Sequence, residues 1–203
     1  APPVDLRFPL FVKPVASDAS EGIAHASVVQ DVEALAARVA FLHQQFGQEV
    51  IAEEFVDGRE FYVSLVGARD ALQVLPLVEL VFDKEKNPPE ERIATRSAKW
   101  DERYRERRGI RNVFARPLAE KSREELERAC IGAFHALGLH DYARCDVRVD
   151  AAGQVWIIEA NANPFIAEGH DFAESAAKAG LAYPALIERL VELALQRHPR
   201  APT

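Results

Sequence analysis

Apolar positions along the chain follow two different periods, one typical of helices and one typical of strands. From Asp31 to Gly47 they recur with helical spacing, and Gly47 is the kind of residue that ends a helix. A Ser-x-x-Glu pattern at 122–125 predicts the start of a second helix, which continues to Gly138. The helical spacing returns over residues 183–196. The pattern therefore predicts three amphipathic helices.

Short apolar runs between these helices predict strands. Two runs separated by an Asp-Gly pair predict a β-hairpin over residues 49–67, because Asp-Gly suits a tight turn. A second hairpin is expected over 146–161, and further strands over 8–14 and 71–80. Strands and helices alternate without clean βαβ units, which favours an α+β fold over a doubly wound sheet.

Residues 83–117 interrupt this pattern. They are polar and rich in arginine, and they predict a long loop with helical turns. Loops of this length inside a compact domain are usually functional or disordered. The eight Lys and Arg residues from Arg92 to Arg111 would grip phosphates, bind RNA, or simply belong to a solvated loop.

The composition is that of a globular protein, with 48% hydrophobic and 28% charged residues. A net charge of −7 disfavours nucleic acid and anionic membranes as partners, so a polyanion such as ATP would need local cations. Cys130 and Cys145 form neither a metal spacing nor a disulfide framework, which indicates a reducing compartment and predicts a cytoplasmic location. No apolar run approaches the roughly 20 residues of a membrane span. The glycine fingerprints of dinucleotide-binding and P-loop proteins are absent, as are the metalloprotease and serine-hydrolase motifs.

The sequence VWIIEANANPF, residues 155–165, carries the clearest chemical signal. Its four apolar residues predict a buried strand. Glu159 and Asn161 follow at alternate positions and therefore point to the same face. A buried strand that ends in acceptor-rich side chains indicates a ligand at its end.

The predicted hairpin brings two more groups to this face. Pairing Asp150 with Gly153 places Arg144 opposite Glu159, and Asp146 diagonal to Glu159 on the same side. Two carboxylates and an amide oxygen suit Mg²⁺ or Mn²⁺. The pattern predicts a divalent metal site, and the alternative is a solvated strand end with surface ion pairs.

Three further side chains are weaker candidates. Lys13 ends an apolar strand beside a small-residue loop, where it would reach a phosphate or be solvated. Glu53 interrupts an apolar run, and would bind a ligand or face water. Glu60 follows the Asp-Gly turn and is no stronger by itself.

Taken together and in order, these residues resemble the ATP-grasp enzymes, most closely the D-alanine–D-alanine ligase family. The resemblance covers nearly the whole chain and matches the central and C-terminal parts of the family, whose N-terminal substrate domain has no counterpart here. It implies an ATP-grasp fold of two α+β lobes, residues 1–56 and 57–203, with the nucleotide between them. The segments that carry it are FVKP (11–14), VASDASEGI (15–23), EEFVDGRE (53–60), ARCDV (143–147) and IIEANANP (157–164).

The resemblance also implies a role for each matched residue. The metal ligands would be Asp146, Glu159 and Asn161. Arg144 would stabilise an oxyanion, and Lys99 lies in the segment that resembles the family's mobile loop. The implied nucleotide contacts are Lys13 with phosphates and adenine, Glu53, Phe55 and Val56 with adenine, and Glu60 with the ribose.

The sequence departs from the family at two places. The loop at 15–23 contains one glycine, Gly22, where the family has a richer run. After NANP, Phe165 replaces the family's glycine and His170 falls near its serine, which together hold the second substrate's carboxylate. The bulk of Phe165 argues against D-alanine as the second substrate.

The implied activity is that of an ATP-dependent carboxylate–amine ligase, which forms a peptide bond through an acyl phosphate. Its cofactors would be ATP and Mg²⁺ (or Mn²⁺), and its substrates amino acids or peptides. A carboxylate is a poor electrophile, so phosphorylation would activate it for attack by an amine. The alternatives are a ligase for other amino acids or peptides, an ATP-binding fragment without activity of its own, and an RNA-binding protein. A homodimer and a missing N-terminal domain stay open.

Overall fold

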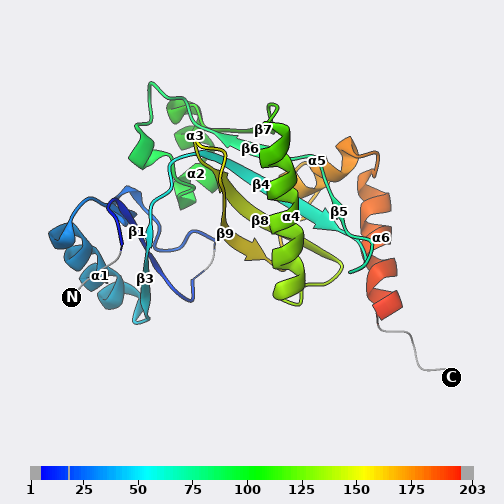
Figure 1. The fold of residues 1–203 in the computed structure, drawn as a ribbon, viewed down its shortest axis with the longest axis horizontal. Helices are drawn as coiled ribbons and strands as arrows, with labels where there is room; N and C mark the ends of the chain where they lie inside the picture. The colour runs from blue at the N-terminus through cyan, green and yellow to red at the C-terminus, as the bar shows by residue number, and fades with distance from the viewer. Residues whose placement is uncertain (1–5, 18, 198–203) are drawn as a thin grey trace. The chain divides into compact units, whose positions relative to one another are not determined.

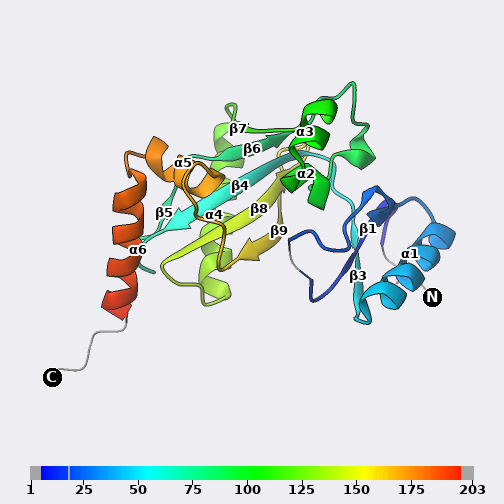
Figure 2. The same cartoon turned by 180° about the vertical axis from the view of Figure 1, so that it is seen from behind.

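The computed structural model describes residues 6–17 and 19–197, which fall into two compact units. The first combines the chain up to Asp57 with Phe82–Arg111, and the second combines Gly58–Val81 with the chain from Asn112 onward. Each unit contains helices and an antiparallel sheet, which Figure 1 and Figure 2 draw from opposite sides. This mixture confirms the α+β prediction.

The first unit contains a three-stranded sheet in the order β2-β1-β3, formed by β1 (Leu10–Pro14), β2 (Val28–Val29) and β3 (Val50–Glu54). A short 3-10 helix, η1 (His25–Ser27), precedes β2. Alternate residues of β1 are buried, because successive side chains of a strand point to opposite faces.

Helix α1 (Val32–Phe46) packs on this sheet through the spacing that the sequence predicted. Its N-cap Asp31 accepts a hydrogen bond from the backbone nitrogen of Ala34 at 2.8 Å, and Gly47 ends it in the left-handed conformation. The core between helix and sheet consists of Leu10, Val12, Val29, Leu35 and Leu42.

Residues 82–111 form an ordered substructure of the first unit, with η2 (Pro89–Glu91), α2 (Arg96–Trp100) and α3 (Glu102–Arg108). Buried Asn87 connects its two ends. The side-chain nitrogen of Asn87 donates to the carbonyls of Asp83 and Arg108, each at 2.7 Å, and its oxygen accepts from Arg108 Nε at 2.9 Å. Three donor and acceptor positions of one amide thus stabilise this segment.

The sequence prediction grouped residues 82–111 with the large lobe, whereas their contacts group them with the first unit. Two long-range hydrogen bonds give the physical reason. Ser20 Oγ donates to the carbonyl of Ala94 at 2.7 Å, and His25 Nε2 shares a hydrogen bond with the Tyr104 hydroxyl at 2.9 Å. Sequence continuity alone does not reveal such contacts.

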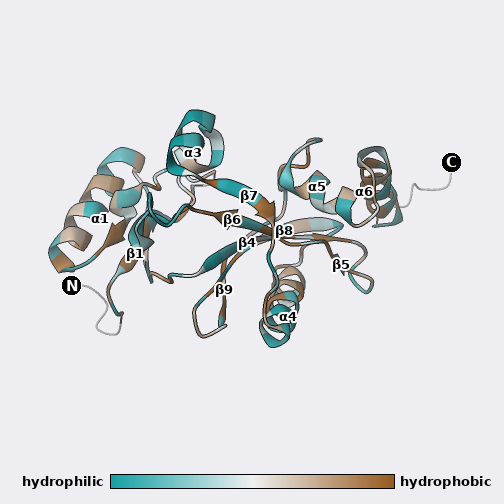
Figure 3. Cartoon of the chain, turned by 90° about the horizontal axis from the view of Figure 1, so that it is seen from above, coloured by the Kyte–Doolittle hydropathy of each residue, from teal (hydrophilic) through white to brown (hydrophobic). Residues whose placement is uncertain are grey.

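The second unit contains a six-stranded sheet in the order β7-β6-β4-β8-β9, with β5 paired to β4. In Figure 3, α4 lies on one side of this sheet, and α5 and α6 lie on the other. Its elements are β4 (Arg59–Val66), β5 (Gln73–Val74), β6 (Val78–Val81), β7 (Arg111–Phe114), α4 (Glu120–Ala136), β8 (Tyr142–Val149), β9 (Val155–Asn161), α5 (Asp171–Lys178) and α6 (Tyr183–Arg197).

The two central strands, β4 and β8, present different chemistry on their two faces. Apolar residues of both strands, such as Phe61 and Val147, pack against Leu126, Cys130 and Phe134 of α4. The polar residues from Glu60 to Ser64 of β4 and from Tyr142 to Arg148 of β8 alternate with these and therefore share the opposite face. That polar face carries the candidate functional site.

Several predicted elements differ from the structure. The Ser-x-x-Glu pattern does not start α4, because Ala119 is the N-cap and Ser122 lies inside the helix, where its hydroxyl donates to the carbonyl of Gly153 at 3.1 Å. The strand predicted over 71–80 is divided into β5 and β6. β2, β7 and α5 were not predicted, because β2 and β7 are short and α5 follows an irregular loop.

Candidate functional site

The pairing of β8 with β9 decides which side chains reach the polar face. The predicted register is wrong by one residue at the hairpin loop and by one more at a bulge. The hairpin loop has three residues, 151–153, so the Asp150 nitrogen donates to the carbonyl of Gln154 and Asp150 does not pair with Gly153 as a strand residue. Val147 then pairs with Ile157, but Asp146 pairs with Glu159. Ile158 is therefore a β-bulge, an extra residue without a partner on β8.

The bulge has a direct consequence for the site. Without it, Glu159 would pair with Cys145 and point toward the core, because a shift by one residue exchanges the two faces of a strand. With it, Asp146 stands directly opposite Glu159, and Arg144 stands opposite Asn161. These are the four residues that the sequence predicted to converge, and they lie closer than the predicted diagonal pairing implied.

The apolar residues before the bulge are not a buried strand, as the sequence had indicated. Trp156, Ile157 and Ile158 are 36–42% exposed. The reason is that β9 lies at the end of the strand order and has a neighbour on one side only.

Arg144 and Asp146 form the charged centre of the polar face. Arg144 Nε and Nη2 donate to Asp146 Oδ1 and Oδ2 at 2.6 and 3.0 Å, a two-pronged geometry that strengthens an ion pair. Asp146 is 2% exposed, and a carboxylate oxygen of Glu159 lies 4.0 Å from Arg144 Nη2. One guanidinium thus neutralises part of the charge of two carboxylates.

Tyr62 on β4 lies directly beneath this pair. It is the cross-strand partner of Asp146, and the guanidinium carbon of Arg144 lies 4.7 Å from the centre of its ring. Burial, together with the charges of Glu60 and Asp146, raises the pKa of Tyr62 well above its ordinary value. Burial opposes the charge on Arg144, but the carboxylate of Asp146 outweighs it and raises the pKa of Arg144. The phenol therefore stays neutral and the guanidinium stays charged.

Asn161 belongs to a hydrogen-bonded turn at the end of β9. Its Oδ1 accepts from the backbone nitrogen of Asn163 at 2.9 Å, and the Tyr142 hydroxyl donates to Asn163 Oδ1 at 2.8 Å. An amide oxygen has two lone pairs, so this bond leaves Asn161 able to bind a second partner. The turn fixes the direction in which Asn161 points.

The donor set fits a hard divalent cation. Asp146, Glu159 and Asn161 offer carboxylate and amide oxygens on one face, as Mg²⁺ prefers. Among the described residues, no three His, Cys, Asp or Glu side chains are grouped to hold a metal by themselves. A cation would therefore need oxygens from a bound ligand as well, and it would share Asp146 with Arg144.

The predicted nucleotide contacts of the first unit lie on β3 and β1. Lys13 Nζ forms an ion pair with Glu53 Oε2 at 2.7 Å, across the paired strands. The backbone nitrogen of Phe55 donates to the carbonyl of Pro9 at 2.9 Å, and Val56 follows it in the chain. The pairing of β1 with β3 thus brings Lys13 to Glu53, which the sequence could not show.

The remaining predicted residues lie in different surroundings. Lys99 lies in the last turn of α2, whose N-cap is Thr95. Glu60 is buried on β4 and forms an ion pair with Arg148 of β8. In the Arg-rich segment, Arg105 donates to the carbonyl of Ala98, and other arginines bond within the segment as well.

Sequence reasoning missed Tyr62, Tyr142 and Arg148 as members of the polar face. A usable signal was present, because the polar residues of β8 alternate strictly from Tyr142 to Arg148. Strands with one polar face show this alternation. The same reasoning applies to Glu60, Tyr62 and Ser64 on β4.

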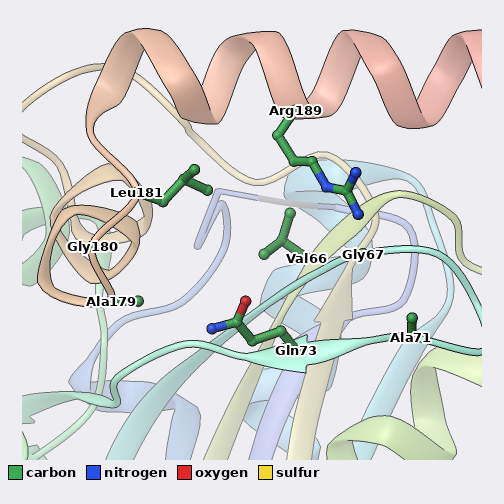
Figure 4. A pocket seen from close by; sticks show the side chains of 8 residues that line it. All are labelled: Val66, Gly67, Ala71, Gln73, Ala179, Gly180, Leu181 and Arg189. Atoms are coloured by element: carbon green, nitrogen blue, oxygen red, sulfur yellow. The ribbon is translucent and has the colours of Figure 1, made fainter.

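A cavity of about 280 Å³ lies elsewhere in the second unit, near the end of β4. In Figure 4 the guanidinium of Arg189 projects from α6 on one side of it, and Gln73 lies on the other. None of the predicted site residues lines this cavity. Its lining is Val66, Gly67, Ala71, Gln73, Ala179, Gly180, Leu181 and Arg189.

Residues 4–192 match the family described as the C-terminus of D-ala D-ala ligase. The chain belongs to the D-Ala–D-Ala ligase family. This confirms the resemblance that the ordered motifs predicted.

Relatives of this ligase-family chain agree over nearly its whole length. An uncharacterised protein of Sinorhizobium fredii, y4sG, is 29% identical over 194 residues, which are 96% of this chain and 54% of that protein. A D-alanine–D-alanine ligase of Chromohalobacter salexigens is 31% identical over 188 residues, 92% of this chain and 53% of that enzyme. The chain therefore spans about half the length of the curated relatives it matches.

Solved structures show that this member of the family has the ATP-grasp fold. The D-alanine–D-alanine ligase of Bacillus anthracis complexed with ATP superimposes with a TM-score of 0.70 at 22% identity, over 94% of this chain and 53% of that one. The VanG D-Ala:D-Ser ligase of Enterococcus faecalis gives 0.73 at 21% identity, over 93% and 50%. None of the helices in the described residues has the length and apolarity that crossing a membrane requires.

Proposed function

We propose that this chain provides the ATP- and metal-binding part of a carboxylate–amine ligase, which forms a peptide bond through an acyl phosphate. The observation that supports it best is the convergence of Arg144, Asp146, Glu159 and Asn161 on one face of the sheet. Membership of the D-Ala–D-Ala ligase family supports the class of reaction.

The metal role is assigned to three oxygen donors. Asp146, Glu159 and Asn161 would hold Mg²⁺ or Mn²⁺ together with phosphate oxygens of ATP. The ion, when bound, would supply positive charge that neutralises the phosphate oxygens. Arg144 balances Asp146 in the ion's absence.

Arg144 also has the properties of an oxyanion stabiliser. It is charged, its side chain is 15% exposed, and contacts with Asp146 and the Tyr62 ring hold it from two sides. A donor fixed in advance costs little reorganisation when negative charge develops nearby. We assign it to the charge that develops when an amine attacks the acyl phosphate. Lys99 is assigned to the transferred phosphate.

The nucleotide is assigned to residues that the family resemblance selected. Lys13 would contact phosphates and adenine, Glu53, Phe55 and Val56 the adenine, and Glu60 the ribose. The ion pair between Lys13 and Glu53 supports a joint role, because each fixes the other's position.

The second substrate is proposed to be an amino acid or peptide other than D-alanine. After the turn at Asn163, the Phe165 side chain is half exposed and its ring meets the His170 ring edge-on, with centres 4.5 Å apart. Two rings beside the end of β9 reduce the space for a compact binding pocket and offer an apolar surface. A phosphate-release screen over amino acids and dipeptides would identify this substrate.

The decisive experiment combines binding with turnover. Mg-ATP should raise the melting temperature of the wild type, and Glu159→Gln should reduce that shift. Glu127→Gln is the matched control, because Glu127 is a carboxylate on α4 that pairs only with its helix neighbour Arg123 in the described contacts. Phosphate release that depends on an added amino acid would support the ligase. No shift in the wild type would refute every ATP-dependent function.

A second candidate function is an ATP-binding piece without turnover of its own. It is supported by the length of the curated relatives, about twice the span matched here. Under this alternative Mg-ATP would still shift the melting temperature, but no amino acid would stimulate phosphate release. Repeating the screen with a longer polypeptide that includes upstream coding sequence would separate the two.

A further inference from the structure

A buried ion pair lies on the polar face, two ladder positions from the proposed metal ligand Asp146. Glu60 on β4 and Arg148 on β8 are cross-strand partners, and the next pair on the same face is Tyr62 with Asp146. Arg148 Nε and Nη2 donate to Glu60 Oε2 at 3.1 and 2.9 Å. Both side chains are less than a tenth exposed.

Arg148 contacts one of the two carboxylate oxygens of Glu60. Both hydrogen bonds end on Oε2 of Glu60, so Oε1 keeps its capacity to accept a bond from another molecule. Two guanidinium nitrogens that donate to one oxygen fix where Oε2 lies, and the buried Glu60 side chain has little room to rotate. Glu60 is thus oriented before any ligand arrives.

Stability alone is a weak explanation for such a pair. Removing two charges from water costs about as much as their attraction returns, and apolar replacements are often as stable. On the opposite face of the same strands, Phe61 and Val147 pack against α4 without any charge. An ion pair on the ligand-facing side therefore points to a role in recognition.

We propose that Arg148 is a positioning residue that holds Glu60 so that its Oε1 accepts a hydrogen bond from a ribose hydroxyl of ATP. This inference rests on the proposed function, which assigns the ribose to Glu60. Arg148 acts through Glu60 and contacts no reacting atom. Its loss would weaken recognition of the sugar, while the metal ligands would stay in place.

The test compares ATP with its 2′-deoxy and 3′-deoxy analogues, using dissociation constants measured by calorimetry with Mg²⁺. The wild type should bind ATP about tenfold more tightly than at least one analogue, as expected for a bond to a charged acceptor. Arg148→Met should bring that ratio close to one, mainly by weakening ATP. Arg148→Lys keeps the charge but loses the pair of hydrogen bonds from Nε and Nη2, and should lower the ratio at least threefold. If the methionine variant does not fold, the lysine variant decides.

Two further variants separate positioning from general stability. In a Glu60→Gln background, Arg148→Met should change the ratio no further, because the two residues act as one unit. Arg59→Met is the matched control: Arg59 pairs with buried Glu79 on the other face of β4, so it should lower stability and keep the ratio.

Each outcome addresses one proposal. If the wild type does not bind Mg-ATP, the proposed function fails. If the wild type binds and discriminates, but both Arg148 variants keep its ratio, the positioning role is overturned and ATP binding stands. A ratio that falls equally in Arg59→Met would also overturn it.

Discussion

Replacing Asp146 with alanine would leave the Arg144 guanidinium without its two-pronged partner in a site where only 15% of its side chain is exposed. Breaking a buried ion pair by removing one member costs about 3–5 kcal/mol. Glu159, at 4.0 Å, remains as a second negative charge and reduces the cost to the lower end of that range. We expect a loss of about 3 kcal/mol, which for a chain of this size lowers the melting temperature by about 6–12 °C.

The assay is urea unfolding at pH 7 without metal, followed by circular dichroism. Glu159→Ala is the control, because Glu159 is half exposed and its contact with Arg144 is long; its cost should stay below about 1 kcal/mol. Asp146→Asn should fall between the two, since an amide oxygen still accepts one hydrogen bond. If the free energy of unfolding of Asp146→Ala lay within 1 kcal/mol of the wild type, the ion pair would not stabilise this part of the sheet.

Three further predictions concern the framework around the site. Gly58→Ala should destabilise by more than about 2 kcal/mol in thermal unfolding, because the added carbon would lie 2.4 Å from the carbonyl oxygen of Val149; an unchanged melting temperature would contradict this. Arg59 and Arg116 outweigh burial and lower the pKa of Glu79, so its stabilisation is present above the ordinary carboxyl pKa and is lost as pH falls below it. Between pH 5 and pH 2 the free energy of unfolding should therefore fall less steeply in Glu79→Gln than in the wild type. Parallel curves of unfolding free energy against pH would contradict this. Asn87→Ala should expose the segment 83–108 to proteolysis sooner than in the wild type, since three hydrogen bonds are lost; equal cleavage rates would refute its bridging role.

The sequence predicted the fold class and most of the regular elements, since helical spacing and an Asp-Gly turn depend on local chemistry. It could not predict where residues 82–111 pack, because that placement depends on contacts with Ser20 and His25, more than 70 residues away along the chain. It also misjudged Ser122, whose hydroxyl bonds to a hairpin loop that a local pattern cannot foresee.

Four residues of the candidate site were predicted to share one face, but the way in which they pair was not. Alternation placed Glu159 with Asn161, and the predicted hairpin added Arg144 and Asp146. The pairing of Asp146 with Glu159 depends on a three-residue loop and one extra residue, neither of which periodicity reveals. Arg148 could have been placed on the polar face by the alternation along β8, but its partner Glu60 becomes known only from the pairing of β8 with β4.

Because Ile158 is an extra residue in β9, the number of residues in this stretch matters as much as their identity. The residues that follow it on β9, Glu159 to Asn161, change side if one residue is gained or lost there, whereas a change of two restores the original orientation. Evolution should accordingly tolerate substitutions along this stretch more readily than single insertions. An alignment of distant family members that places a gap after Ile158 would match Glu159 with residues that point to the opposite face.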